Sequence, residues 1–191
     1  MQSGIIINSY KIGEKDGIVK ILSQSGEIIS GFVKYGFSSK NHARIQVANL
    51  VNFSWIGREN SLGTVKLDII KQYGAATIGN KIAFLSIVAI CSVINTIIAK
   101  NTQHQANLYQ SIAQFLENNT TPTSNTNIIE EYLKQEAYIL AQSGYFDSQS
   151  QYNTVTNIEF LTQILNKYNK QVPHERLMFE KYIVKYLENN I

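Results

Sequence analysis

One stretch of the chain alternates basic and aromatic side chains, which are the residue types that bind a single strand of nucleic acid. It contains Lys34, Tyr35, Phe37 and Lys40, and Arg44 follows shortly after. Lysine and arginine neutralise phosphates, whereas aromatic rings stack on unpaired bases of any sequence. The same composition also suits a solvated loop that only keeps the protein soluble, and both rings also suit a protein core. Chemistry alone leaves these interpretations open.

Three further lysines precede this stretch, around a predicted hairpin whose turns are marked by glycines: Lys11, Lys15 and Lys20. Residues 1–80 hold nine basic and five acidic residues, whereas residues 81–191 hold eight and nine. The positive balance of the chain, formally +3 over 191 residues, is therefore confined to the N-terminal part. Such an excess permits binding to a polyanion without requiring it.

The remaining reactive side chains form no catalytic or metal-binding pattern. The three histidines, at positions 42, 104 and 174, lack metal-ligand spacing and a cysteine partner. The single cysteine, Cys91, excludes an internal disulfide and lies in an apolar run that does not stabilise a thiolate. No glycine-rich loop of the kind that holds a nucleotide is present. We therefore expect no enzyme, no cofactor and no metal.

The elements that must position the basic stretch are β-strands. Five runs with two-residue alternation, separated by glycine and serine turns, predict strands at 5–8, 17–22, 27–34, 45–55 and 64–70. In the last run, Val65, Leu67 and Ile69 are expected to share one face. Short antiparallel strands must close on themselves to hide their edges, so we predict a five-stranded barrel of the OB kind. An SH3-like barrel fits the pattern almost as well.

After residue 80 the apolar period changes to that of helices. Residues 82–99 contain no charge, which predicts a central buried helix, and a membrane span is the competing interpretation. Apolar stripes predict further helices, and a polar loop is expected at 118–127. Pro173 suits the first turn of a last helix. The fold class is therefore α+β, with a barrel over residues 1–80 and an all-helical domain over 81–191.

Short motifs occur in a fixed order along nearly the whole chain. In the barrel they are Gly4-Ile5-Ile6-Ile7, the hairpin run from Glu14 to Leu22, Ser25-Gly26, and Lys34-Tyr35-Gly36-Phe37-Ser38-Ser39-Lys40. In the helical part they are Lys134-Gln135-Glu136, Ile139-Leu140 and Gly144-Tyr145, followed by two helices around Pro173. This order of features resembles the RecO family of recombination mediators.

The resemblance implies a non-enzymatic DNA repair protein of the bacterial cytoplasm, associated with the nucleoid. It implies binding to single- and double-stranded DNA, annealing of strands, and assistance to RecA loading in the RecF pathway. The implied partners are RecR and the C-terminal tail of the single-strand-binding protein. DNA contacts would come from Lys11, Lys15, Lys20, Lys34, Tyr35, Phe37, Lys40 and Arg44. Lys134 takes the place of a family arginine beside the groove for the tail, although an exposed pair with Glu130 also explains it.

The chain also departs from the family pattern. Many members carry zinc-binding cysteines after the glycine–aromatic pair, whereas Tyr145-Phe146-Asp147-Ser148-Gln149 contains none, so no zinc finger is expected. Phe37 stands where an arginine is common. These departures leave a second hypothesis open, a protein-interaction adaptor whose degenerate OB domain binds repair partners but little DNA.

Overall fold

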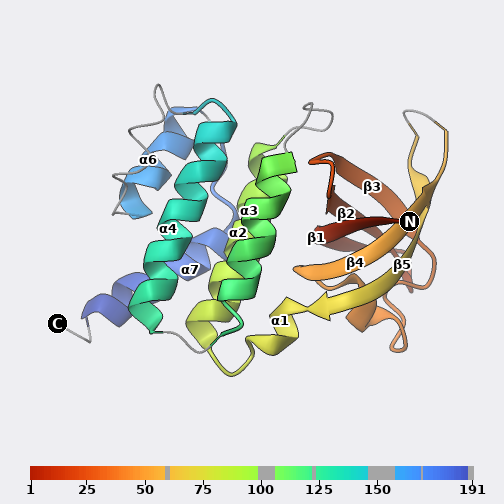
Figure 1. Ribbon diagram of the computed structural model, residues 1–191, viewed down its shortest axis with the longest axis horizontal. Helices are drawn as coiled ribbons and strands as arrows, with labels where there is room; N and C mark the ends of the chain where they lie inside the picture. Colours follow the sequence, from red (N-terminus) through yellow and green to blue (C-terminus); the bar gives the residue numbers. More distant parts are fainter. Residues whose placement is uncertain (59–60, 99–105, 122–123, 146–157, 169, 189–191) are drawn as a thin grey trace.

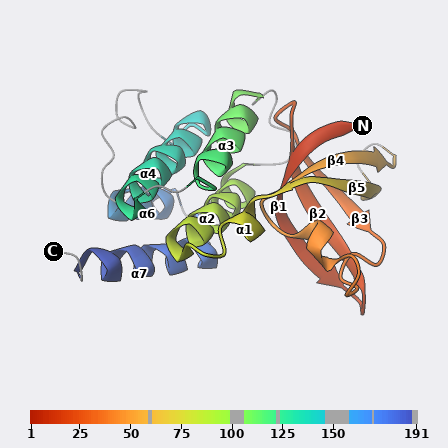
Figure 2. The ribbon, with the colours of Figure 1, turned by 60° about the horizontal axis from the view of Figure 1, so that its bottom comes forward.

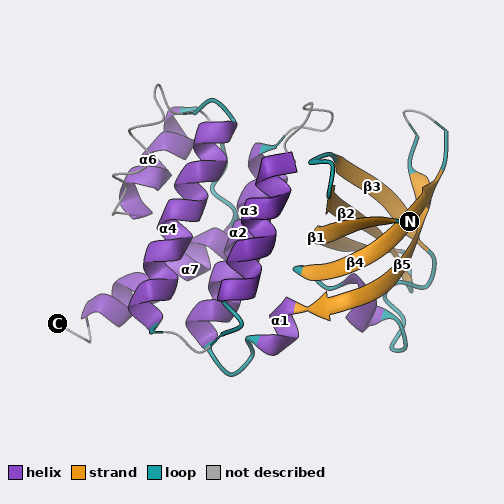
Figure 3. Cartoon of the chain, in the orientation of Figure 1, coloured by secondary structure: helices purple, strands orange, loops and turns teal. Residues whose placement is uncertain are grey.

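Five strands at the N-terminal end close into a barrel, and the helices lie against one side of it (Figure 1). The structure is a computed structural model that describes residues 1–58, 61–98, 106–121, 124–145, 158–168 and 170–188. The strands are β1 (Gln2–Ile12), β2 (Asp16–Ser23), β3 (Ile28–Val33), β4 (Asn49–Ile56) and β5 (Gly63–Gln72). Apart from a short helical turn at residues 42–45, which lies against the barrel, strands and helices occupy separate halves of the molecule, as Figure 3 shows by colour.

The barrel closes in the order β1-β2-β3-β5-β4, which confirms the predicted OB architecture. All neighbouring strands are antiparallel except β3 and β5, which pair in parallel through Gly31 and Phe32. This crossing is tight, because a Cβ atom on Gly31 would overlap the Val65 side chain. Glycine at this position therefore lets the last strand insert between β3 and β4 and close the barrel.

The helical elements follow the predicted order. They are η1 (His42–Ile45), α1 (Tyr73–Ala76), α2 (Lys81–Ile97), α3 (Ala106–Asn118), α4 (Asn125–Gln142), α6 (Ile158–Lys167) and α7 (His174–Glu188). Asn80 begins α2, because its side-chain oxygen accepts a hydrogen bond from the Ala83 amide. Helix α2 lies between α7 on one side and α3 and α4 on the other (Figure 2). Its central, buried position is therefore confirmed.

Two apolar cores hold the fold together. The barrel interior contains Ile6, Val19, Ile21, Ile45, Val51, Phe53, Val65 and Leu67. Alternation along β1 points Ile5 and Ile7 the opposite way, into a larger core that they share with Leu22 and the helices. Three polar contacts join the same two halves, from Ser3 to Tyr109, from Lys20 to Asn95, and from Lys71 to Glu117. The outer face of β1 and β2 is thus partly covered by helices.

The charge-free segment after residue 80 is a core helix. Of its residues, Ile87, Ala89, Ile90 and Cys91 are fully buried by neighbouring elements. Among the residues that the structure describes, none of the helices is long and apolar enough to cross a membrane.

Some predicted boundaries are wrong. The run 45–55 does not form one strand, because residues 42–45 form a 3-10 helix and Ala48 adopts a left-handed φ of 65° before β4 begins. Ile69 pairs with the buried Val51 and so shares a face with Val65 and Leu67 as predicted, although its own side chain is exposed. The predicted polar loop is shorter than expected, because Ser124 caps α4 through the Asn127 amide. The residues expected to replace the zinc finger, 146–149, lie outside the described residues.

Candidate nucleic-acid interface

The β1–β2 hairpin and the loop after β3 are joined at one end of the barrel. The Phe37 amide donates a hydrogen bond of 2.7 Å to the Lys15 carbonyl oxygen. The Tyr35 amide donates a second bond of 2.7 Å to Oδ1 of Asp16. Two segments that carry predicted DNA-binding residues, about 20 positions apart in the sequence, therefore form one surface.

The loop after β3 is held in a compact turn around Tyr35. This residue has a left-handed φ of 55°, which is uncommon for a residue with a side chain. Its carbonyl oxygen accepts hydrogen bonds from the Ser38 amide, the Ser38 hydroxyl and the Asn41 side chain. The ring is half exposed, and the Lys34 ammonium lies 5.1 Å from its centre. An exposed aromatic ring beside a cation is a suitable stacking platform for a base.

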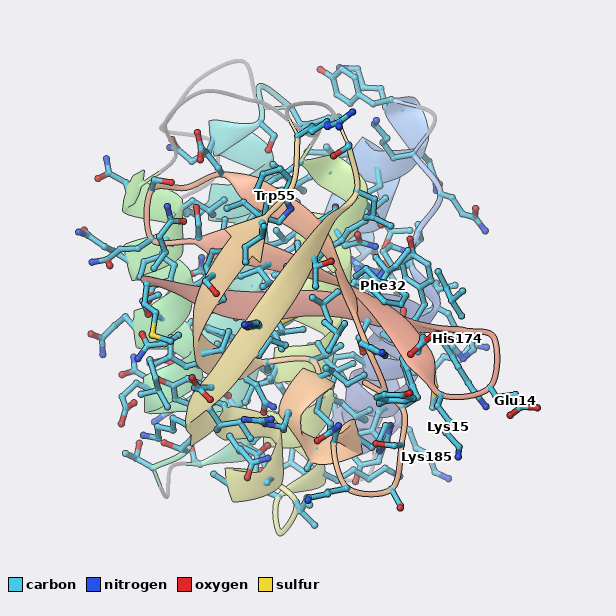
Figure 4. The ribbon with its side chains drawn as sticks, turned by 90° about the vertical axis from the view of Figure 1, so that its right-hand side faces the viewer. Glu14, Lys15, Phe32, Trp55, His174 and Lys185 are labelled. Atoms are coloured by element: carbon cyan, nitrogen blue, oxygen red, sulfur yellow. The ribbon has the colours of Figure 1, made fainter. Side chains whose placement is uncertain are left out.

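Four lysines surround this turn with their side chains exposed: Lys11, Lys15, Lys34 and Lys40. Figure 4, which faces the barrel, shows Lys15 at the hairpin and directed away from the barrel. Within the described part of the chain, none of the four forms an ion pair. Their charges are therefore available to neutralise phosphates.

The structure places the other three predicted contacts differently. The Phe37 ring is half-buried against the barrel core, where a Cβ on Gly17 would come within 2.8 Å of it. Lys20 donates a hydrogen bond of 2.7 Å to Asn95 of α2. Arg44 forms an exposed ion pair of 3.1 Å with Asp68. Lys20 and Arg44 are therefore paired with other side chains of the protein, and Phe37 is packed against the barrel core. Lys20 and Arg44 thus do not belong to the set of unpaired cations.

An apolar row on the outer face of the barrel escaped the sequence reasoning. The strand register aligns Tyr10, Ile18, Phe32, Thr64 and Ile56, one residue from each strand of the barrel. Tyr10 is 44% exposed and Ile56 is 63% exposed, whereas Ile18 is buried. Phe32 is labelled on the barrel in Figure 4. The sequence contains one indication of this row: Phe32 and Lys34 are two residues apart, so in an extended strand both would lie on the same face. Of this row, Tyr10 directly precedes Lys11 and Phe32 lies two residues before Lys34.

The helical part contains a buried ionic cluster that links three helices. Arg176 of α7 donates to both oxygens of Glu136 of α4, at 3.1 and 3.3 Å, and also binds Glu180. It further donates to the Thr162 hydroxyl at 2.7 Å and to the Ile158 carbonyl oxygen at 2.9 Å. Burial raises the pKa of the Glu136 carboxyl, and the charge of Arg176 opposes that rise. The cluster positions α4, α6 and α7.

Lys134 lies two residues before Glu136, on the exposed side of α4. The structure records no ion pair between Lys134 and Glu130, so the pairing considered from the sequence is not formed. Lys134 is consequently an exposed cation on the surface of α4.

The single cysteine lies in the core of the helical part, apart from this surface. Cys91 is fully buried, and burial raises the pKa of its thiol to about 12. Over the described ranges, no group of three or more histidine, cysteine, aspartate and glutamate residues is arranged to hold a metal ion.

The amino-acid sequence is similar to a known protein family and to named proteins of two bacteria. Residues 1–73 match a family profile described as "Recombination protein O N terminal". A protein of Orientia tsutsugamushi (strain Ikeda) named "DNA repair protein RecO" is 32% identical over 142 residues, or 74% of this chain. A protein of the same name from Rickettsia akari (strain Hartford) is 27% identical over 143 residues. The matched region spans 57% of the first relative and 58% of the second.

Proposed function

This chain belongs to the RecO family, and on that premise we propose that it acts in DNA repair by binding nucleic acid rather than as an enzyme. The observation that carries this proposal is the set of four lysines, unpaired within the described residues, around the exposed Tyr35 ring. Lysines that neutralise phosphates give affinity for any sequence, and a ring that stacks on bases favours strands whose bases are unpaired.

The charge of this surface sets an expected salt dependence. Each neutralised phosphate of a single strand contributes a slope of about −0.7 to the logarithmic dependence of affinity on salt. Four lysines that each meet one phosphate therefore give a slope of about −3. The slope reports the number of contacts, so it tests the surface more sharply than affinity alone.

The finer parts of the proposal follow from the family. We propose that the barrel, residues 1–80, binds single- and double-stranded DNA and anneals strands. The helical part, residues 81–191, would meet RecR and the acidic tail of the single-strand-binding protein, with Lys134 as a cation for that tail. Together these activities would assist RecA loading in the bacterial cytoplasm. Because the chain spans little more than half the length of its relatives, each of these activities needs its own test.

The decisive experiment measures fluorescence anisotropy of a labelled single-stranded oligonucleotide across a salt series. The variant Lys34→Glu/Lys40→Glu should bind more weakly, with a slope reduced by about 1.4, while its melting temperature stays near that of the wild type. Lys181→Glu, a single exposed charge reversal on α7, is the control outside the barrel and should bind like the wild type. Equal affinity of the double variant and the wild type would refute the assignment of the loop.

One observation favours the second hypothesis, an adaptor with little affinity for DNA. Three of the eight predicted contacts, Lys20, Phe37 and Arg44, are engaged within the protein. The adaptor would retain RecR or the single-strand-binding protein in a pull-down and show no oligonucleotide binding even at low salt. Salt-dependent binding by the wild type would instead support the mediator.

A further inference from the structure

We propose that Asp16 is a positioning residue that joins the two basic segments into one binding surface, so that it strengthens nucleic-acid binding despite its negative charge. This inference rests on the proposed function and deepens it. Its basis is a contact between a carboxylate and a backbone amide that lies 19 residues away in the sequence.

The contact holds the backbone at Tyr35, a residue in the uncommon left-handed conformation. Asp16 is the first residue of β2, and its Oδ1 atom accepts the Tyr35 amide at 2.7 Å. Hydrogen bonds from backbone amides to a carboxylate are stronger than those between neutral groups. Tyr35 has the left-handed φ of 55°, in which its carbonyl oxygen serves as acceptor for Ser38 and Asn41. Asp16 therefore binds the backbone amide of Tyr35. The carbonyl oxygen of the same residue accepts the hydrogen bonds from Ser38 and Asn41 that hold the loop in its turn.

In the described part of the chain, this is the one side-chain hydrogen bond between the hairpin and the loop after β3. The backbone bond from the Phe37 amide to the Lys15 carbonyl oxygen is the second link. With both in place, Lys15 on the hairpin and Lys34 on the loop have a defined relative position. Without Asp16, the segment from Lys34 to Gly36 loses the partner of its central amide, although Phe37 still anchors the residues that follow.

Preorganisation gives the carboxylate its effect on binding. Ordering a loop at the moment of association costs free energy, and a loop that is already ordered avoids this cost. A carboxylate near a polyanion acts in the opposite direction, because like charges repel. Electrostatics alone thus predicts that removing Asp16 tightens binding, whereas a positioning role predicts that it weakens binding. The two effects differ in sign and can be separated.

Glu14 provides a matched control on the same hairpin. Its side chain is exposed and extends from the hairpin tip in Figure 4. Glu14→Ala removes the same charge as Asp16→Ala without removing a contact to the loop. Asp16→Asn removes the charge but keeps an oxygen that can accept the Tyr35 amide. Asp16→Glu keeps the charge but moves the carboxylate by one methylene.

The experiment measures the affinity of each variant for a labelled single-stranded oligonucleotide across the same salt series. We expect Glu14→Ala and Asp16→Asn to bind at least as tightly as the wild type. Asp16→Ala should bind about threefold to tenfold more weakly. Its salt slope should also be shallower, because misaligned lysines contact fewer phosphates. If Asp16→Ala does not fold, as judged by circular dichroism, Asp16→Glu replaces it, with weaker binding again expected.

The outcomes separate this inference from the proposed function. Wild-type binding together with an Asp16→Ala affinity equal to that of Glu14→Ala would overturn the positioning role and leave the proposed function in place. Absence of salt-dependent binding by the wild type would overturn both. Weakening by Asp16→Ala with recovery in Asp16→Asn would establish that the hydrogen bond, and not the charge, carries the effect.

Discussion

Replacing Arg176 by methionine tests how the helical part is held together. Neither Arg176 nor Glu136 exposes any side-chain surface, and the guanidinium also binds Glu180, Thr162 and Ile158. Methionine fills a similar volume but donates no hydrogen bond, so the buried Glu136 carboxyl loses its counter-ion and must either stay charged without one or take up a proton. Breaking a buried ion pair from one side costs about 3–5 kcal/mol. We expect the upper part of this range, because the Thr162 hydroxyl and the Ile158 carbonyl oxygen each also lose a hydrogen bond from the guanidinium.

The loss should depend on pH in a defined direction. Burial already raises the pKa of the Glu136 carboxyl above its usual 4.5, and removal of Arg176 raises it further. The folded variant then holds a proton that the unfolded chain has released. Its stability therefore falls as the pH rises from about 4.5 to the folded pKa, by about 1.4 kcal/mol for each pH unit in that interval. The loss should therefore be larger at pH 7.5 than at pH 5.

The assay is urea unfolding followed by circular dichroism at both pH values. Lys181→Met, an exposed substitution on the same helix, is the control and should change stability by less than about 0.5 kcal/mol. The double variant Arg176→Met/Glu136→Leu should recover much of the lost stability, because no charge remains buried between the two positions. A cost below about 1 kcal/mol for Arg176→Met, or an equal cost at both pH values, would refute this reasoning.

Two further predictions concern the cores. The Cys91 thiol is fully buried, and burial raises its pKa to about 12. It should therefore resist iodoacetamide at pH 8 in the native protein and react once the protein is denatured. Labelling is measured by mass spectrometry, and rapid labelling of the native protein would contradict the burial. Phe37→Ala should lower the free energy of unfolding in urea by about 1–3 kcal/mol, less than for a fully buried phenylalanine because the ring is only half-buried. A change within about 0.5 kcal/mol would mean that the ring does not support the barrel.

The sequence predicted the features that depend on near neighbours along the chain. Two-residue alternation located β2 and the buried positions Val65 and Leu67 of β5. Ile129, Leu133, Ala137 and Leu140 are spaced in the sequence as on one face of a helix, and all four are buried. Gly144 has the left-handed φ of 78° that a residue after a helix end requires. These patterns are local, because a strand repeats every two residues and a helix about every 3.6.

The end of β5 and the residues before β4 were not predicted from the sequence, because their conformation depends on pairing with distant segments. The alternation of β5 places Ile69 on the same face as Val65 and Leu67, and its pairing with the buried Val51 agrees, yet Ile69 is exposed, next to the point where the register against β4 shifts. The residues from Ile45 to Ala48 have the apolar character of a strand, yet Ala48 turns the backbone and its amide binds the Ile6 carbonyl oxygen of β1. The conformation of these residues is therefore decided by a neighbouring strand rather than by their own propensities.

By itself, the sequence determined a barrel followed by helices, a buried central helix, and a basic N-terminal part. The tertiary structure decided which cations remain unpaired, because Lys20 binds Asn95 of α2, 75 residues away, whereas Lys15 and Lys34 meet no acid among the described residues. It also decided that Asp16 holds Tyr35 and that Glu136 meets Arg176, 40 residues away. Periodicity determines the face on which a side chain lies. What covers that face depends on contacts between segments far apart in the chain, which no local pattern encodes.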